Sequence, residues 1–297
     1  MARTTSEFTE HQMSDFLSKH RLPNDFRDVA EHSYLPLVEQ LPKRRSGRVP
    51  LLLGINGAQG TGKSTLADFL RLAAESRFGW SVAVLSIDDF YHTQDMRQAL
   101  SKDVHPLLAT RGVPGTHDVD MLDAYIERLQ RAGRDDEIAL PRFDKATDDR
   151  AEASRWPVVK GPIDLIILEG WCVGTRPQSA EDLEPPINAL ERDDDEDGHW
   201  RRYVNDQLKT RYAKVFARLD MLVFLAAPSF DAILRWRLEQ ERKLADKSPS
   251  GATGLMNEHQ IRGFIQFYER LTRANLGTLR DTADVVFELD ETHSIVS

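Results

Sequence analysis

Five short apolar runs, separated by stretches of helical character, constrain the fold of this chain more than any other feature. They are PLLLGI at 50–55, SVAVLSI at 81–87, DLIILE at 164–169, DMLVFLA at 220–226 and DVVFEL at 284–289. None of them alternates strictly between apolar and polar residues, and such runs are typical of strands buried on both faces of a parallel sheet. Strands that alternate with helices predict an α/β fold with right-handed crossovers.

The rest of the chain divides around these runs. Residues 50–297 contain all five, and we expect them to form the main domain. Residues 1–49 show apolar residues at mixed spacings of three and four, which predicts a helical N-terminal extension packed on that domain. Two segments are predicted to be loops: the acidic run ERDDDEDG at 191–198, expected to be solvated, and the Gly/Ser-rich SPSGATG at 248–254.

The charge and the cysteine content make several classes of protein improbable. The chain has 48 acidic and 39 basic residues and a net charge of −9, whereas a general nucleic-acid binder would show a basic surface. Cys172 is the only cysteine, so no intrachain disulfide forms, which fits a reducing compartment. The start lacks an apolar secretory segment, and no apolar run approaches the ~18 residues of a spanning helix. We therefore expect a soluble, cytoplasmic protein without nucleic-acid or membrane partners. The sequence leaves the oligomeric state open.

A glycine-rich segment, GAQGTGKST at 57–65, follows the first apolar run directly. It matches the phosphate-binding pattern G-x-x-x-x-G-K-[ST] and lies between a predicted strand and a predicted helix, as that motif requires. A chance glycine-rich turn would not explain this context. The loop is expected to bind phosphate through its backbone N–H groups and the helix N-terminus. The predicted nucleotide-binding residues are Gly57, Ala58, Gln59, Gly60, Thr61, Gly62, Lys63, Ser64 and Thr65.

Three residues are candidates for the chemistry at these phosphates. Lys63 should reach the β- and γ-phosphates, and the Ser64 hydroxyl should ligate Mg²⁺. The third apolar run ends at Glu169, and an acid at the end of the strand beside the phosphate strand holds Mg²⁺ directly or through water in this class of fold. Glu169 alone would be a weak signal, because many strands end in an acid. ATP and Mg²⁺ are therefore the predicted nucleotide and metal.

The second apolar run ends in two adjacent carboxylates, Asp88 and Asp89. Consecutive side chains of a strand point to opposite sides, so the two aspartates are expected to have different roles. One of them can face the phosphates and accept a proton from an attacking hydroxyl, which is general-base catalysis. The other can cap the next turn or hold a metal-bound water. No N-K-x-D segment for guanine binding occurs in the chain, which argues against a GTPase.

Positive charges gather in three places of this acidic protein. The predicted helix ILRWRLEQERK at 233–243 carries Arg235, Arg237, Arg242 and Lys243 beside the Gly/Ser-rich loop. A lid around 230–255 could bring such arginines over the phosphates and exclude water, with Arg237 as a catalytic residue. The alternative is a solvated helix with ordinary ion pairs.

The other two cationic segments are candidates for binding an acceptor. RGVPGTHD at 111–118 and LPRFDKATDDRA at 140–151 are broken by Gly or Pro, and both suit an anionic acceptor, because arginine binds carboxylates in a bidentate manner. The alternative for each cation is a surface ion pair, and for the histidine a structural hydrogen bond. The candidate residues are Arg111, His117, Arg142, Lys145 and Arg150.

Together these segments resemble the phosphoribulokinase/uridine kinase-like family of P-loop kinases. Within it, SIDDFY, RGVPGTHD, LPRFDKATDDRA and LEGWCVG are most similar to the D-glycerate 3-kinase branch of plants and fungi. The resemblance runs from about Leu51 to the C-terminus and includes FIQFYERL. It implies a P-loop kinase domain over 50–297, with a five-stranded parallel sheet in the order 2-3-1-4-5 and helices on both faces. The C-terminal helix lacks a proline that is expected in this branch.

The resemblance also implies an activity and site residues. The activity is ATP-dependent phosphorylation of D-glycerate to 3-phosphoglycerate with Mg²⁺. Asp88 is implied as the base, and Asp89 is expected to support the metal through water. Tyr91 of the same segment is a predicted acceptor contact. Lys145 stands where uridine kinases have an aromatic residue, which favours a small acid over a nucleobase. A uridine- or pantothenate-type kinase and a nucleotide-binding regulatory module without transfer activity remain the alternatives.

Overall fold

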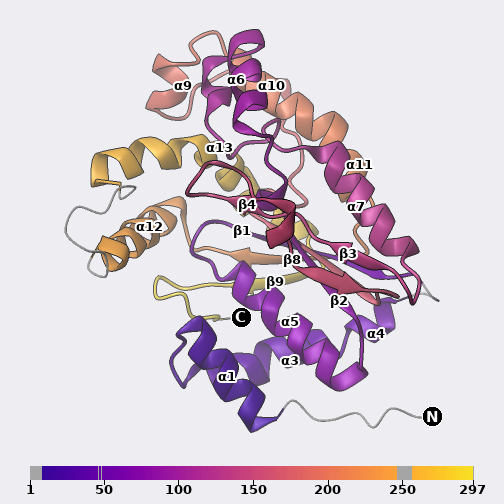
Figure 1. Ribbon diagram of the computed structural model, residues 1–297. Coiled ribbons are helices and arrows are strands. Elements are labelled where there is room, and N and C mark those ends of the chain that lie inside the picture. The colour runs from indigo at the N-terminus through magenta and orange to yellow at the C-terminus, as the bar shows by residue number, and fades with distance from the viewer. Residues whose placement is uncertain (1–8, 46, 48, 246–255, 297) are drawn as a thin grey trace.

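A five-stranded parallel sheet forms the centre of the protein, seen in the computed structural model of Figure 1, which describes residues 9–45, 47, 49–245 and 256–296. The spatial order of the strands is β2-β7-β1-β8-β9. In chain order of the five strands this is 2-3-1-4-5, so the predicted strands and their order are confirmed. The strands are β1 (Leu51–Gly57), β2 (Val82–Ser86), β7 (Leu165–Gly170), β8 (Met221–Ala226) and β9 (Val285–Glu288).

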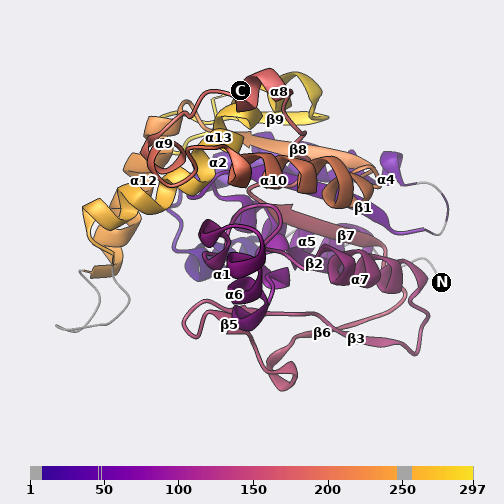
Figure 2. The same cartoon turned by 90° about the horizontal axis from the view of Figure 1, so that it is seen from above.

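Burial on both faces explains why these strands appear as continuous apolar runs. Every residue of β1 and of β7 is buried. Leu51, Leu53 and Ile55 of β1 belong to the hydrophobic cluster on one face, whereas Leu52, between the first two, belongs to the cluster on the other face. Helices cover both faces (Figures 1 and 2), which gives the expected three layers.

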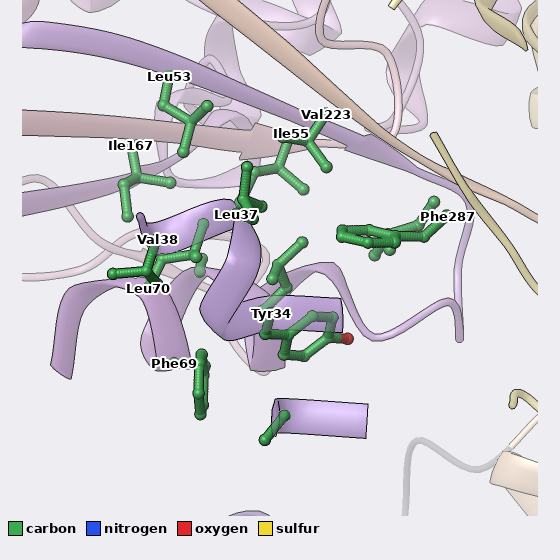
Figure 3. Packing of buried hydrophobic residues seen from close by; sticks show 14 of the residues in the cluster. Tyr34, Leu37, Val38, Leu53, Ile55, Phe69, Leu70, Ile167, Val223 and Phe287 are labelled. Carbon is green, nitrogen blue, oxygen red and sulfur yellow. The ribbon is translucent and has the colours of Figure 1, made fainter. Parts of the chain in front are cut away.

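One face is covered by α5 (Lys63–Phe78) together with the N-terminal helices. Tyr34, Leu37 and Val38 pack against Phe69 and Leu70 of α5 in the same cluster as the strand residues, as Figure 3 shows. The expected helices of the N-terminal segment are therefore part of the core that supports the sheet. They are α1 (Glu10–His20), α2 (Phe26–Val29), a π-helical turn (Ala30–Tyr34), α3 (Leu35–Val38) and α4 (Leu41–Arg44).

The other face is covered mainly by α7 (Val119–Arg131), α10 (His199–Gln207) and α13 (Glu258–Thr282), which contribute to the second hydrophobic cluster. The lid segment contains α12 (Phe230–Ala245). The remaining α-helices and strands are α6 (Gln94–Asp103), β3 (Glu137–Ala139), β4 (Phe143–Asp144), β5 (Asp149–Arg150), β6 (Val158–Lys160), α8 (Ala180–Leu183), α9 (Ala189–Asp193) and α11 (Ala213–Phe216). None of the described helices combines the length and apolar character that crossing a membrane requires.

The acidic run at 191–198 departs from its prediction as a solvated loop. Its first residues belong to α9, and Glu191 is fully buried, where it accepts two hydrogen bonds from Arg270 at 2.7 and 2.6 Å. Asp195 is also buried and pairs with Arg201 at 3.0 Å. The prediction was wrong at these two acids, because each has a buried arginine partner outside the run, whereas Arg192, Asp193, Asp194, Glu196 and Asp197 are exposed as expected. The predicted loop at 248–254 lies outside the described residues.

Candidate active site

The glycine-rich loop connects the end of β1 to the start of α5, as the motif requires. A Cβ atom on Gly57 would lie 2.4 Å from the Thr61 hydroxyl oxygen, so only glycine fits at this close approach. Gly62 has a φ of 87°, in the left-handed region that glycine adopts without strain, and immediately precedes the first residue of α5. The loop therefore presents the N-terminal end of a 16-residue helix to the space beyond the sheet.

Lys63, Ser64 and Glu169 meet at the base of this loop. The Lys63 ammonium group lies 3.5 Å from the Ala58 carbonyl oxygen, a long contact that a phosphate can replace. The Ser64 hydroxyl donates to Glu169 Oε1 at 3.1 Å. Glu169 is buried, and its Oε2 atom has no hydrogen-bond partner among the described residues.

These oxygens fit Mg²⁺. The ion prefers oxygen ligands and is bound in nucleotide sites by one or two protein groups together with phosphates and water. The Ser64 hydroxyl and the unpartnered Glu169 oxygen match that requirement. The described residues contain no cluster of three or more acidic, histidine or cysteine side chains suited to a metal.

A cavity of about 750 Å³ extends from the loop across the carboxyl ends of the strands. It joins the phosphate loop to several of the predicted catalytic and acceptor residues in one continuous space. Gly57, Ala58 and Thr61 of the loop do not line it. Its lining includes Gln59, Gly60, Gly62, Lys63, Ser64, Thr65, Asp88, Tyr91, Arg111, Lys145, Asp148, Trp171, Arg237 and Tyr268.

Asp88 faces this cavity from a 3₁₀ turn (Ile87–Phe90) that directly follows β2. Its Oδ1 atom accepts a hydrogen bond from the Tyr91 hydroxyl at 3.0 Å, and its Oδ2 atom accepts one from Lys145 at 2.8 Å. Burial alone would raise the pKa of Asp88, but the ammonium groups of Lys145 and Lys63 outweigh burial and lower the pKa. The carboxylate is therefore ionised at neutral pH.

Asp89 has a different set of partners. Its Oδ1 atom accepts from the Phe143 backbone N–H at 3.0 Å, and its Oδ2 atom accepts from Arg142 at 3.2 Å. Burial raises the pKa of Asp89 to about 6 against the opposing charge of Arg142, and the carboxylates of Asp88 and Glu169 add to the rise. The two aspartates separate as expected. The reason differs, because a 3₁₀ turn rather than strand alternation directs neighbouring side chains about 120° apart.

The predicted acceptor cations divide into two groups. Arg111 and Lys145 line the cavity, and Arg111 also pairs with Asp148. Arg142 and Arg150 do not line it. Arg142 holds Asp89, and Arg150 donates to the Tyr91 carbonyl oxygen at 3.3 Å and pairs with Asp118.

His117 also lies outside the cavity lining, where the structural alternative describes it better. Its ring is buried and stacks on Tyr91 with 4.4 Å between ring centroids. Its Nδ1 atom lies 2.7 Å from the Tyr212 hydroxyl. Burial lowers the pKa of His117 to about 3, so the ring is neutral at physiological pH. His117 therefore supports Tyr91, which in turn contacts Asp88.

The lid arginines also have distinct positions. Arg237 of α12 lines the cavity and pairs with Glu241 at 2.7 Å, whereas Arg235 points to Glu291 in the C-terminal segment. Arg242 is exposed. The Lys243 side chain and the rest of the predicted lid at 246–255 lie outside the described residues.

Two site residues were not found from the sequence. Arg97 of α6 is buried and donates to the His92, Ala109 and Asp148 carbonyl oxygens, with an ion pair to Asp148 at 2.9 Å. Nothing in the ordinary helical sequence around it indicates this role. Tyr268 reaches the cavity from α13 and packs edge-on against Trp171. The segment FIQFYERL contains it and was one of the similarities noted in the sequence.

Comparison of the sequence and the structure with known proteins identifies the family of this chain. No model of a protein family matches the sequence. The structure of D-glycerate 3-kinase from Cryptococcus neoformans superimposes with a TM-score of 0.70 at 26% identity, covering 93% of this chain and 98% of that one. The uncharacterized kinase mug58 of Schizosaccharomyces pombe is 33% identical over 265 residues, or 85% of this chain and 90% of that protein. The chain belongs to the phosphoribulokinase/uridine kinase family of P-loop kinases, in its D-glycerate 3-kinase-like branch.

A further relative of this P-loop kinase is the chloroplastic D-glycerate 3-kinase of Arabidopsis thaliana. The two are 29% identical over 240 residues, which cover 77% of this chain and 48% of the plant protein. The similarity to these kinases supports the assignment of this chain as a phosphotransferase that uses ATP and acts on a small molecule.

Proposed function

We propose that this kinase transfers the γ-phosphoryl group of ATP to a hydroxyl of a small anionic hydroxy acid, with D-glycerate, converted to 3-phosphoglycerate, as the best candidate. One observation carries the proposal. A single cavity joins the phosphate loop to a carboxylate, Asp88, and to two of the predicted acceptor cations, Arg111 and Lys145. The names of the plant and fungal relatives support the choice of D-glycerate.

In this proposal the loop positions the nucleotide. Its backbone N–H groups and Lys63 bind the phosphates, and Ser64 and Glu169 would hold Mg²⁺, which would neutralise negative charge on the phosphates when bound. Arg237 enters the same cavity from α12 and can add positive charge near the transferred group. Most of the rate enhancement in phosphoryl transfer comes from such positioning and charge stabilisation.

Asp88 is the proposed general base. The acceptor hydroxyl oxygen forms a bond to the γ-phosphorus while the bond from that phosphorus to the ADP oxygen breaks. The hydroxyl proton passes to Asp88, and ADP leaves. The lowered pKa of Asp88 keeps the carboxylate ready to accept this proton at neutral pH.

Asp89 is assigned a different role from the predicted one. Both of its oxygens hold the segment that carries Lys145, through the Phe143 N–H and Arg142. We therefore assign Asp89 to positioning this segment rather than to a metal-bound water. Arg142, Arg150 and His117 support the same region, as their contacts outside the cavity indicate.

An ADP-release assay with a panel of acceptors tests the proposal. Purified protein with ATP and Mg²⁺ is offered D-glycerate, pantothenate, uridine or ribulose 5-phosphate, and the product is analysed by ³¹P NMR. D-glycerate is expected to give the highest kcat/KM, with phosphate on the 3-hydroxyl, and Lys63→Ala should abolish the reaction. A preference for pantothenate or uridine would identify another kinase of the family. ATP binding without transfer to any acceptor would indicate a regulatory module.

A further inference from the structure

We infer that Lys145 determines specificity by covering the catalytic base: its ammonium group occupies Asp88 until an anionic acceptor draws it away. The inference rests on the proposed function and deepens it. An anionic acceptor would thereby expose the base that its own hydroxyl needs. Neutral alcohols and water would meet a base that is still covered.

Each carboxylate oxygen of Asp88 accepts one hydrogen bond, and the two donor side chains differ in burial. Oδ1 accepts from Tyr91, whose ring is buried and stacked on His117. Oδ2 accepts from Lys145 at 2.8 Å, and the Lys145 side chain is 61% exposed. The Tyr91 contact is fixed by packing, whereas the Lys145 contact can open toward the cavity. Oδ2 is therefore the oxygen that an acceptor hydroxyl can use.

The backbone around Lys145 is held in place while its side chain is not. Lys145 lies in the turn between β4 and β5. On one side of the turn the Phe143 N–H binds Asp89, and on the other Asp148 binds Arg97 and Arg111. The lysine side chain itself is a flexible four-carbon stem with a compact charge. It can swing between Asp88 and a second anion without any change in the turn.

The contact can open because its lysine end lies in solvent. The Lys145 side chain is 61% exposed, so water solvates its ammonium group when the pair separates. The Asp88 side chain is only 29% exposed and would then need another hydrogen-bond donor, which the acceptor hydroxyl supplies. An acceptor carboxylate bound beside Arg111 would offer Lys145 an equivalent partner. A neutral acceptor offers none, so the lysine stays on Asp88. Selectivity then comes from a penalty on the wrong substrate as well as from attraction to the right one.

The same contact would restrain ATP hydrolysis. In that side reaction a water oxygen bonds to the γ-phosphorus, the bond to ADP breaks, and the water proton passes to Asp88, which gives ADP and phosphate. With Oδ2 covered, water lacks its base. The negative charge of the acceptor thus draws Lys145 away from Asp88 and makes the base accessible to the acceptor hydroxyl, which is a form of induced fit.

Lys145→Met tests this inference, with Arg155→Met as the matched control. Arg155 is likewise an exposed cation of the same region, but it pairs with Asp144 and does not line the cavity. ADP release is measured with D-glycerate, with glycerol, which replaces the carboxylate by a neutral hydroxymethyl group, and with no acceptor. Lys145→Met should raise acceptor-free hydrolysis roughly tenfold or more, because the base becomes open to water.

The two acceptors give the second readout. Loss of a charged hydrogen bond should lower the preference for D-glycerate over glycerol by about 10- to 100-fold in Lys145→Met. Lys145→Arg, which keeps the charge, should retain low hydrolysis, and Arg155→Met should behave like the wild type. Circular dichroism confirms that each variant is folded.

Three outcomes would overturn the inference. The first is a Lys145→Met protein that loses D-glycerate turnover while its acceptor-free hydrolysis is unchanged or lower, because Lys145 would then only bind the acceptor. The second is a wild-type enzyme that phosphorylates glycerol as efficiently as D-glycerate. The third is an Arg155→Met protein with the same rise in hydrolysis. A wild type that phosphorylates no acceptor would refute the proposed function instead, and the hydrolysis measurement would still decide the role of Lys145.

Discussion

Replacing Arg270 by methionine should destabilise this kinase strongly. Arg270 lies on α13, two residues after Tyr268, and its guanidinium group binds both carboxylate oxygens of Glu191. It also donates to the carbonyl oxygens of Asp182 and Pro185, each at 2.7 Å. The variant would remove the Arg270 donor from all four of these oxygens and leave the fully buried Glu191 without its countercharge, with the Ile187 N–H still donating to Oε2.

The expected magnitude follows from that burial. Removing one partner of a buried ion pair typically costs about 3–5 kcal/mol, because the remaining charge stays out of water without compensation. The matched control is Arg262→Met on the same helix, which breaks a pair with Glu258 in which both side chains are more than half exposed. Exposed pairs four residues apart on a helix contribute about 0.3–0.5 kcal/mol. The two substitutions remove the same charge, and their free energies of unfolding should therefore differ by about 2.5 kcal/mol or more.

Urea unfolding followed by circular dichroism measures both free energies. The KM for the acceptor provides a second measurement, because α13 carries Tyr268 into the cavity. We expect Arg270→Met to raise this KM and to leave the affinity for ATP unchanged. The reasoning would be refuted if Arg270→Met were no more destabilising than Arg262→Met.

Two further predictions concern the pH dependence of stability and the metal. His117 has a folded-state pKa of about 3 against 6.5 unfolded, so its contribution to stability is complete above pH 6.5 and is lost as the pH falls toward 3. Between pH 7 and pH 5 this loss amounts to ~2 kcal/mol of the free energy of unfolding. Urea titrations at the two pH values should therefore show a drop in this free energy that is smaller by ~2 kcal/mol in His117→Asn than in the wild type. An equal drop in both proteins would count against the buried neutral ring. Ser64→Ala removes a proposed Mg²⁺ ligand, and the Mg²⁺ concentration for half-maximal activity should rise about tenfold or more; an unchanged Mg²⁺ requirement would exclude Ser64 as a ligand.

The features predictable from the sequence were those that local pattern determines. The continuous apolar runs located all five strands, because a strand buried on both faces needs apolar residues at every position. The glycine-rich motif located the phosphate loop for a similar reason, since its backbone geometry requires glycine at fixed positions.

The features that could not be predicted depend on partners far apart in the chain. An acidic run such as 191–198 is usually solvated, and only the fold brings Arg270, which is 79 residues away in the sequence, to Glu191. The sequence marked Arg142 and Arg150 as unusual cations in an acidic protein. It did not show that they pair with Asp89 and Asp118 outside the cavity. No sequence pattern indicated the structural role of Arg97, because its hydrogen-bond partners come from three separate segments of the chain.

The central claim is that Asp88 is the base of a kinase acting on a hydroxy acid, and turnover of D-glycerate by Asp88→Asn tests it most directly. With ATP affinity measured in parallel, kcat should fall by about 10²–10⁴-fold while ATP still binds, because a positioned general base contributes that much. Asp89→Asn should instead act mainly through a higher KM for the acceptor, since Asp89 holds the segment that carries Lys145. An Asp88→Asn enzyme that binds ATP and retains full turnover would contradict the account.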